Sequence, residues 1–373
     1  MNGAQTMRIG LGVLVLIGGL GACVGAALMA TRGQEPGATG TRSAAASSSG
    51  SGTDTAGGQD PATSGDQRLQ QNRAIDRSKP LPLDPVKAPS YLGDQAFVYA
   101  EKIVALGPRY AGRPGWSKQL DLIEAELKKA GLTSKRDTWT DRKELLTFTN
   151  LWATIPGKSK KRIVLACHHD TKCTQGHPEQ DHNFHFVGAN DGASGVAVLL
   201  ALAPILQKQE REATIDLVFF DGEESLDWNW NDAARALFGS KRFARKHREA
   251  LLLGEEARIE AVVLLDMVGR TDLHIQEELY STERMREIVW GAAVATGHQQ
   301  NVYQRAAAAD DDHSPFLRAG IPAVDLIDLD GNPYWHTPMD TIENMSPKSL
   351  QITADLVLTM LPAIEREYVT KQR

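Results

Sequence analysis

Four short clusters in the second half of the chain carry residue types that bind divalent metal ions and move protons. They are Cys167–Asp170, Gly188–Asp191, Phe219–Glu224 and Tyr334–Thr337. Catalytic zinc sites use oxygen and nitrogen ligands of this kind, whereas closed structural zinc sites normally use cysteine. A carboxylate beside such a ligand can act as a general base. The clusters therefore predict a zinc enzyme.

Each cluster also has an ordinary structural explanation. The acidic run 221–224 is commonly a solvated loop, and Asp191 alone could be a helix cap worth ~1 kcal/mol. His336 alone is more often structural than a ligand. His168 and Asp170 could form a hydrogen-bonded pair at a strand end, with Asp170 orienting an imidazole. Four such loops at one edge of a sheet together favour a metal site.

Apolar strands alternate with helices after the first quarter of the chain. We expect strands at 148–155, 162–167, 215–220, 259–265 and 323–327, and helices at 91–106, 117–130, 194–206, 239–250, 283–295, 313–319 and 346–364. Strands that are apolar throughout are typical of a sheet covered by helices on both faces. The predicted fold class is α/β, a single globular domain with a central, mostly parallel or mixed sheet flanked by helices.

The acidic clusters fall where the expected strands end. His168, Asp221–Glu224 and Asp266 each follow directly on one of these strands. In open α/β sheets, ligands bind beyond the carboxyl ends of the strands. We therefore expect the site at this edge of the sheet.

Residues 1–32 are predicted to form an N-terminal signal-anchor. Residues 9–30 contain no charged residue, and a helix of that length spans a hydrocarbon core of ~30 Å. The alternative is a lipoprotein signal with Cys23 as the acylated residue. The apolar run continues past Cys23, which favours the anchor. In either case we expect the rest of the chain to be exported, extracytoplasmic and anchored to the membrane by a helix or a lipid.

Residues 33–88 are rich in Ser, Gly, Ala and Thr and are predicted to be a disordered linker, because they bury too little apolar surface to offset their ordering entropy. Residues 89–373 then form the catalytic domain. The net charge of −6 and the lack of a basic run exclude nucleic acid as a partner. Cys167 and Cys173 could pair in an oxidising compartment or remain free thiols, and the sequence favours neither.

The clusters occur in the order seen in the zinc aminopeptidase superfamily. Within it, residues 89–365 most resemble the animal-type glutaminyl cyclases, or glutaminyl-peptide cyclotransferases. The resemblance is carried by Leu165–Lys172, Asp311–Pro322 and Trp335–Thr337, with Leu106–Arg109 and Phe148–Leu151 upstream. It implies a zinc enzyme whose substrates are peptide or protein N-termini, and which converts an N-terminal glutamine to pyroglutamate with release of ammonia.

The resemblance also implies roles for individual residues. A single zinc ion would be bound by Asp191, Glu224 and His336. Glu223 would carry a proton from the attacking α-amine to the departing ammonia, and Asp266 and Asp311 would form a hydrogen-bonded acidic pair beside it. The substrate pocket would be lined by Trp335, with Trp228 and Trp230 as further candidates.

The same residues suit a second reading, a di-zinc aminopeptidase. His168 and Asp266 would then bind a second zinc, Asp191 would bridge the two ions, and Glu223 would activate water. The set of ligands does not decide between one zinc and two. Trp335 directly before His336 and the run 310–313 favour the cyclase. A third hypothesis, a catalytically inactive binding domain, is disfavoured because every motif acid and histidine is intact.

Two positions depart from the cyclase pattern. Asp310 stands where some cyclases have an amide, and Val196 and Ala197 occupy the place of the family's second disulfide cysteine. The second departure puts a family-type disulfide in doubt, although Cys173 could substitute. The oligomeric state is not predicted.

Overall fold

The computed structural model describes residues 69–255 and 257–371. The predicted signal-anchor and most of the predicted linker lie outside the described residues, so both stay predictions. Within the described residues, no helix has the length and apolar character needed to cross a bilayer. The chain divides into two units, Met1–Asp66 and Gln67–Arg373, and the fold described below is that of the second.

The second unit begins earlier than the expected boundary at residue 89. Ile75 is buried, and Leu81, Leu83 and Val86 pack against the core. The backbone N–H of Val86 also donates to Oγ1 of Thr359 at 3.0 Å. The linker prediction is therefore corrected for residues 69–88. These few apolar side chains hold the segment against the surface of the rest of the domain.

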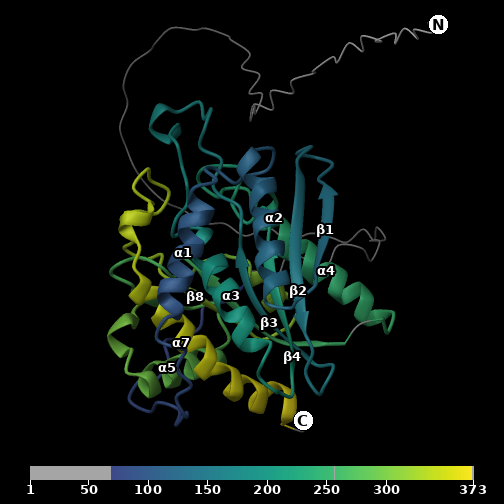
Figure 1. Ribbon diagram of the computed structural model, residues 1–373, viewed down its shortest axis with the longest axis vertical. Helices are drawn as coiled ribbons and strands as arrows, with labels where there is room; N and C mark the ends of the chain where they lie inside the picture. Colours follow the sequence, from purple (N-terminus) through teal and green to yellow (C-terminus); the bar gives the residue numbers. More distant parts are fainter. Residues whose placement is uncertain (1–68, 256, 372–373) are drawn as a thin grey trace, which may run out of the picture. The chain divides into compact units, whose positions relative to one another are not determined.

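A six-stranded mixed sheet lies at the centre of the unit (Figure 1), with strand order β1-β2-β4-β3-β5-β8. The strands are β1 (Ser134–Thr140), β2 (Thr147–Ile155), β3 (Arg162–His168), β4 (Thr214–Phe220), β5 (Ile259–Asp266) and β8 (Ala323–Ile327). β3, β4, β5 and β8 are parallel, and β1 and β2 are antiparallel to their neighbours. The predicted α/β class with a mostly parallel or mixed central sheet is confirmed.

Three strands were not predicted. β1 is largely exposed and polar, so it lacks an apolar run that would reveal it. β6 (Ile275–Glu278) and β7 (Val302–Ala307) form a separate two-stranded parallel sheet. Both strands are short and carry polar side chains.

Helices cover both faces of the central sheet, which explains why its inner strands are apolar throughout. One face packs against α1 (Leu92–Val104), α2 (Pro114–Lys129), α3 (Ala193–Leu206), α5 (Glu283–Thr296) and α7 (Pro347–Ile364). The other packs against α4 (Phe238–Leu252) and α6 (Ser314–Arg318). Along β3, Ile163 and Leu165 face the first layer, whereas Val164 and Ala166 face the second.

The register of the parallel strands brings their carboxyl ends together. His168, the last residue of β3, pairs with Phe220, the last residue of β4. β5 ends next to them at Asp266. The loops that follow these strands therefore meet at one edge of the sheet, as expected.

α3 approaches the sheet so closely that no side chain fits between them at Gly195. A Cβ atom on Gly195 would lie 2.4 Å from the carbonyl oxygen of Leu265 and 2.7 Å from Cβ of Cys167. Both distances are far shorter than van der Waals contact. Because α3 starts just after Asp191, this close approach sets the distance between Asp191 and the end of β5.

Gly195→Ala should destabilise the domain by about 1–3 kcal/mol, because the added methyl group has no space between helix and strand. Helix propensity alone predicts the opposite, a gain of about 1 kcal/mol. The sign of the change in urea-induced unfolding free energy therefore separates the two effects. A stabilised variant would show that α3 is not packed as described.

Candidate metal centre and active site

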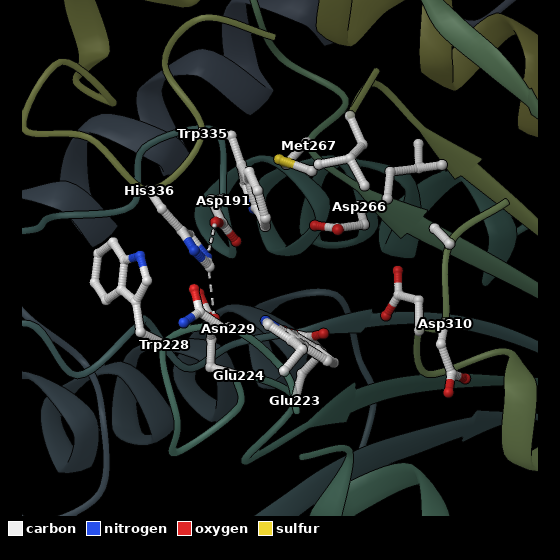
Figure 2. Close-up of a pocket in the computed structure, with 15 residues that line it drawn as sticks. Asp191, Glu223, Glu224, Trp228, Asn229, Asp266, Met267, Asp310, Trp335 and His336 are labelled. Carbon is white, nitrogen blue, oxygen red and sulfur yellow. Dashed lines mark ion pairs between the residues drawn. The ribbon is translucent and has the colours of Figure 1, made fainter. Parts of the chain in front are cut away.

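The first group of candidate ligands consists of Asp191, Glu224 and His336, which come from three separate loops (Figure 2). Nε2 of His336 lies 3.1 Å from Oε2 of Glu224 and 3.4 Å from Oδ2 of Asp191. All three residues are buried. The structure therefore brings together the three predicted ligands of the single-zinc arrangement.

The spacing and bonding of this group fit a zinc ion. Ligand atoms about 2.0–2.1 Å from a tetrahedral zinc lie about 3.3 Å from one another. Both carboxylate oxygens of Glu224 and Oδ2 of Asp191 are buried without a hydrogen-bond donor. Buried carboxylates without donors are costly unless a cation neutralises them. The donor set and its unsatisfied atoms thus suit a divalent metal.

His336 is held in an uncommon backbone conformation. Its φ is +51°, in the left-handed region that non-glycine residues seldom adopt. Such a conformation persists when surrounding contacts fix it, and it is often found at functional sites. In the loop after β8, the backbone at His336 therefore adopts an unfavourable conformation that places the imidazole beside Glu224 and Asp191.

The second group consists of His168, Asp191 and Asp266. Nε2 of His168 lies 3.0 Å from Oδ1 of Asp266 and 3.3 Å from Oδ1 of Asp191. Asp191 thus directs one oxygen to each group, as a bridging ligand would. The contact between His168 and Asp266 is a hydrogen bond, so these two side chains partly satisfy one another.

The charges around the first group shift two carboxyl pKa values in opposite directions. Burial, together with the neighbouring Glu224, raises the pKa of Asp191 to about 6. Burial alone would raise the pKa of Glu224 as well, but His336 and then Lys172 lower it to about 2. Glu224 is therefore ionised at neutral pH even without a metal, whereas Asp191 gains a proton below about pH 6.

Glu223, the predicted proton carrier, lies beside the first group and lines the same pocket. Burial, with added repulsion from Asp311 and Glu224, raises its pKa well above the usual value. Its backbone N–H donates to Oδ1 of Asp170 at 3.2 Å, and the N–H of Glu224 donates to Oδ2 at 3.4 Å. Asp170 therefore positions the backbone of both glutamates, in addition to lying 3.7 Å from Nδ1 of His168.

The predicted acidic pair, Asp266 and Asp311, lies next to Glu223 in the pocket. Burial and the charge of Asp266 raise the pKa of Asp311 to about 7. Asp325, from the middle of β8, lies close to Asp311 and was not predicted as a site residue. Burial and then the charge of Asp311 hold the pKa of Asp325 well above its usual value, which favours the protonated form of this carboxyl group.

Two residues that were not predicted as site residues hold the loop before Asp191. The carboxylate of Asp340 accepts the N–H of Asn190 at 2.7 Å and that of Asp191 at 3.0 Å. The fully buried guanidinium of Arg109 donates to the carbonyl oxygens of Gly188 at 2.8 Å and of Val187. Asp340 lies four residues after His336, so the His336 loop supports the Asp191 loop directly.

Asp191 is not a helix cap. The residue that precedes α3 is Gly192, with φ of +96°, and no side chain caps the helix. A Cβ atom on Gly192 would lie 2.5 Å from the carbonyl oxygen of Asp170, so glycine allows the two loops to touch. The adjacent Asn190 accepts the N–H of Gly269 at 2.7 Å, which links this loop to the turn after Asp266.

A pocket of about 500 Å³ opens above the candidate ligands and includes all three predicted tryptophans, Trp228, Trp230 and Trp335. Trp335 is partly exposed and stacks on the ring of His336 at 4.2 Å. Trp228 lies 5.7 Å from the same imidazole on another side (Figure 2). Trp228 and Trp230 therefore both line the pocket, whereas the sequence alone did not distinguish between them. Cys167 and Cys173 do not form a disulfide with each other.

Comparison with known proteins matches residues 150–361 to the model for peptidase family M28. The chain is 32% identical over 222 residues to a glutaminyl-peptide cyclotransferase of Drosophila melanogaster, a match that covers 52% of this chain and 59% of that protein. It is 31% identical over 279 residues to a glutaminyl-peptide cyclotransferase-like protein of Mus musculus, covering 66% of this chain and 70% of that protein.

Solved structures give the same grouping. A glutaminyl cyclase from an Acidobacteriales bacterium is 32% identical, with a TM-score of 0.66, covering 77% of this chain and 98% of that one. A leucine aminopeptidase precursor from Bacteroides thetaiotaomicron is 26% identical, also with a TM-score of 0.66, and the match covers 74% of this chain and 98% of that one. The expected resemblance to the zinc aminopeptidase superfamily, and within it to the glutaminyl cyclases, is confirmed: this chain belongs to peptidase family M28.

Proposed function

We propose that this chain is a zinc-dependent glutaminyl-peptide cyclotransferase. The observation that carries the proposal is the position of Glu223, a buried carboxyl group beside Asp191, Glu224 and His336 in a pocket lined by tryptophans. The names of the relatives in insects and mammals, and of bacterial structures similar over almost their whole length, support the same activity.

Asp191, Glu224 and His336 are the proposed zinc ligands. Zinc bound there would polarise the side-chain carbonyl of the substrate glutamine. The stacked ring of Trp335 and the ring of Trp228 would pack on the short side chain and exclude water, which would otherwise compete with the α-amine.

Glu223 would transfer the proton. The α-amine nitrogen attacks the γ-carboxamide carbon, a new carbon–nitrogen bond closes the five-membered ring, and the bond to the amide nitrogen breaks. Glu223 accepts the proton lost by the amine and donates it to the leaving nitrogen, which departs as ammonia. Its raised pKa favours holding that proton between the two steps. Asp266 and Asp311, on its other side, would keep it oriented.

One zinc ion is favoured over two. In the first group, Glu224 and one oxygen of Asp191 have no hydrogen-bond donor. In the second group, Nε2 of His168 already bonds Asp266 at 3.0 Å. The unsatisfied charge therefore lies on the side of His336. The complete second ligand set and the similarity to a leucine aminopeptidase precursor keep a di-zinc aminopeptidase as the alternative function.

The purified protein should release ammonia from a peptide that begins with glutamine, and it should not cleave a peptide that begins with leucine. The reason is that tryptophan rings packed on the substrate side chain would exclude water and so favour the amine as the attacking group. Coupled ammonia detection and mass spectrometry of both peptides measure this. Cleavage of the leucine peptide without ammonia release from the glutamine peptide would establish the aminopeptidase instead.

Two adjacent glutamates should respond differently to the same substitution. Glu223→Gln should lower kcat by at least about 10³-fold, because no group remains to carry the proton, yet it should retain zinc. Glu224→Gln is the matched control and should lose zinc, since it removes a ligand. Metal content by mass spectrometry and steady-state rates check both. Full activity in Glu223→Gln would remove this residue from the mechanism.

Zinc affinity should fall as the pH drops through about 6. The folded pKa of Asp191 is raised to about 6, so below that pH a proton occupies the carboxylate and must leave before the metal binds. At pH 5.5 this competition alone weakens zinc binding about fourfold relative to pH 7.5. Competition with a chelator of known pH dependence measures the change. An affinity that is constant over this range would contradict the assignment of Asp191 as a ligand.

A further inference from the structure

Lys172 is a buried cation that the proposed chemistry does not use. It lies four residues after the end of β3 and is only 2% exposed. Lysine is almost never buried to this extent unless its ammonium group is paired, because the charge loses its hydration. Its neighbours therefore indicate what the residue does.

Two of those neighbours are backbone carbonyls of one loop. Nζ of Lys172 donates to the carbonyl oxygen of Ser225 at 2.7 Å and to that of Asp227 at 3.1 Å. These residues lie in the loop between β4 and α4, just before Trp228 and Trp230. Hydrogen bonds from a charged donor are stronger than neutral ones, so the ammonium group holds this part of the loop in place.

The third neighbour is a proposed metal ligand. Nζ lies 3.7 Å from Oε2 of Glu224, the same oxygen that contacts His336. The same ammonium group thus donates hydrogen bonds to the loop and forms an ion pair with the carboxylate at the metal centre.

The two tryptophan rings complete the surroundings. Nζ is 5.8 Å from the ring centre of Trp228 and 5.7 Å from that of Trp230, within the range of cation–π attraction. Trp228 also stacks on His182 at 3.7 Å. Trp230 has a φ of +55°, a conformation that a bulky residue keeps only when its surroundings hold it.

We infer that Lys172 is a positioning residue that fixes the Trp228–Trp230 loop against Glu224 and so sets the shape of the substrate pocket. Without this ammonium group, a loop of this length would be more flexible relative to the metal centre. The inference rests on the proposed function only for its kinetic readout, because the order of the loop can be measured without any activity.

Lys172→Met in the full-length protein tests the inference, since methionine keeps much of the length of the side chain but donates no hydrogen bond. Amide hydrogen exchange in residues 225–236 should become about tenfold faster, while exchange in the strands is unchanged. With a glutamine-initiated peptide, KM should rise about tenfold and kcat should change less than about threefold, because Glu223 remains in place.

Lys161→Met is the matched control. Nζ of Lys161 also donates to a backbone carbonyl, that of Val369 at 2.7 Å, but Lys161 is exposed and does not line the pocket. This variant should show wild-type exchange in 225–236 and a wild-type KM.

Unchanged exchange in 225–236, or a fall in kcat at constant KM, would overturn the inference. If Lys172→Met does not fold, Lys172→Arg is measured in its place, and its larger head group should displace the loop and speed exchange by about threefold. Unchanged exchange in that variant would equally overturn the inference. If the wild-type protein releases no ammonia, the exchange result still decides the role of Lys172.

Discussion

The burial of many carboxyl groups at one edge of the sheet is the constraint on which the rest of the site depends. Asp191, Glu223, Glu224, Asp266 and Asp311 are each at most 6% exposed. Several ionised carboxylates so close together are unstable unless donors, protons or a cation compensate for them. The structure uses a different one of these means for each part of the cluster.

Backbone donors serve the carboxylates that hold the loops together. Asp170 accepts the N–H groups of both glutamates, and Asp340 accepts those of Asn190 and Asp191. Burial and neighbouring carboxylates raise the pKa values of Asp311 and Asp325, which favours their protonated forms. In the first ligand group, both oxygens of Glu224 and Oδ2 of Asp191 have no hydrogen-bond donor. These are the two carboxylates that, with His336, have the spacing of zinc ligands.

The residues that hold the loops in place differ from those proposed to bind the metal or to transfer the proton. Residues of the supporting kind, such as Asp170, Asp340, Arg109 and Lys172, bond to backbone atoms of the loops that carry the ligands or the pocket tryptophans. Close packing of α3 on the sheet through Gly195 then fixes Asp191 relative to Asp266. Precise placement of the first group therefore depends on residues that never contact a substrate.

The sequence predicted the central strands and the clustering of His168, Asp191, Glu223 and Asp266, because these follow or precede strongly apolar segments. It could not predict Asp325, which sits inside an apolar strand and resembles an ordinary β residue there. Nor could it identify Asp340, whose role appears only when the loop after β8 folds over the loop before α3. Such contacts join residues about 150 positions apart, and no local pattern records them.

The resemblance supplied what periodicity could not, namely which glutamate binds the metal and which carries the proton. In the structure, the two side chains have different surroundings. Glu224 contacts His336 at 3.1 Å, and Glu223 has a strongly raised pKa owing to its burial. The antiparallel strand β1 and the packing of residues 69–88 were not foreseen, because both depend on surfaces formed by distant parts of the chain.

We propose that one zinc ion binds between Asp191, Glu224 and His336. Anomalous diffraction at the zinc edge, from crystals grown with zinc, tests it most directly. We expect one peak about 2.0–2.2 Å from a carboxylate oxygen of each acid and from Nε2 of His336. A second peak of equal height between His168 and Asp266, or a single peak there and none beside His336, would contradict it.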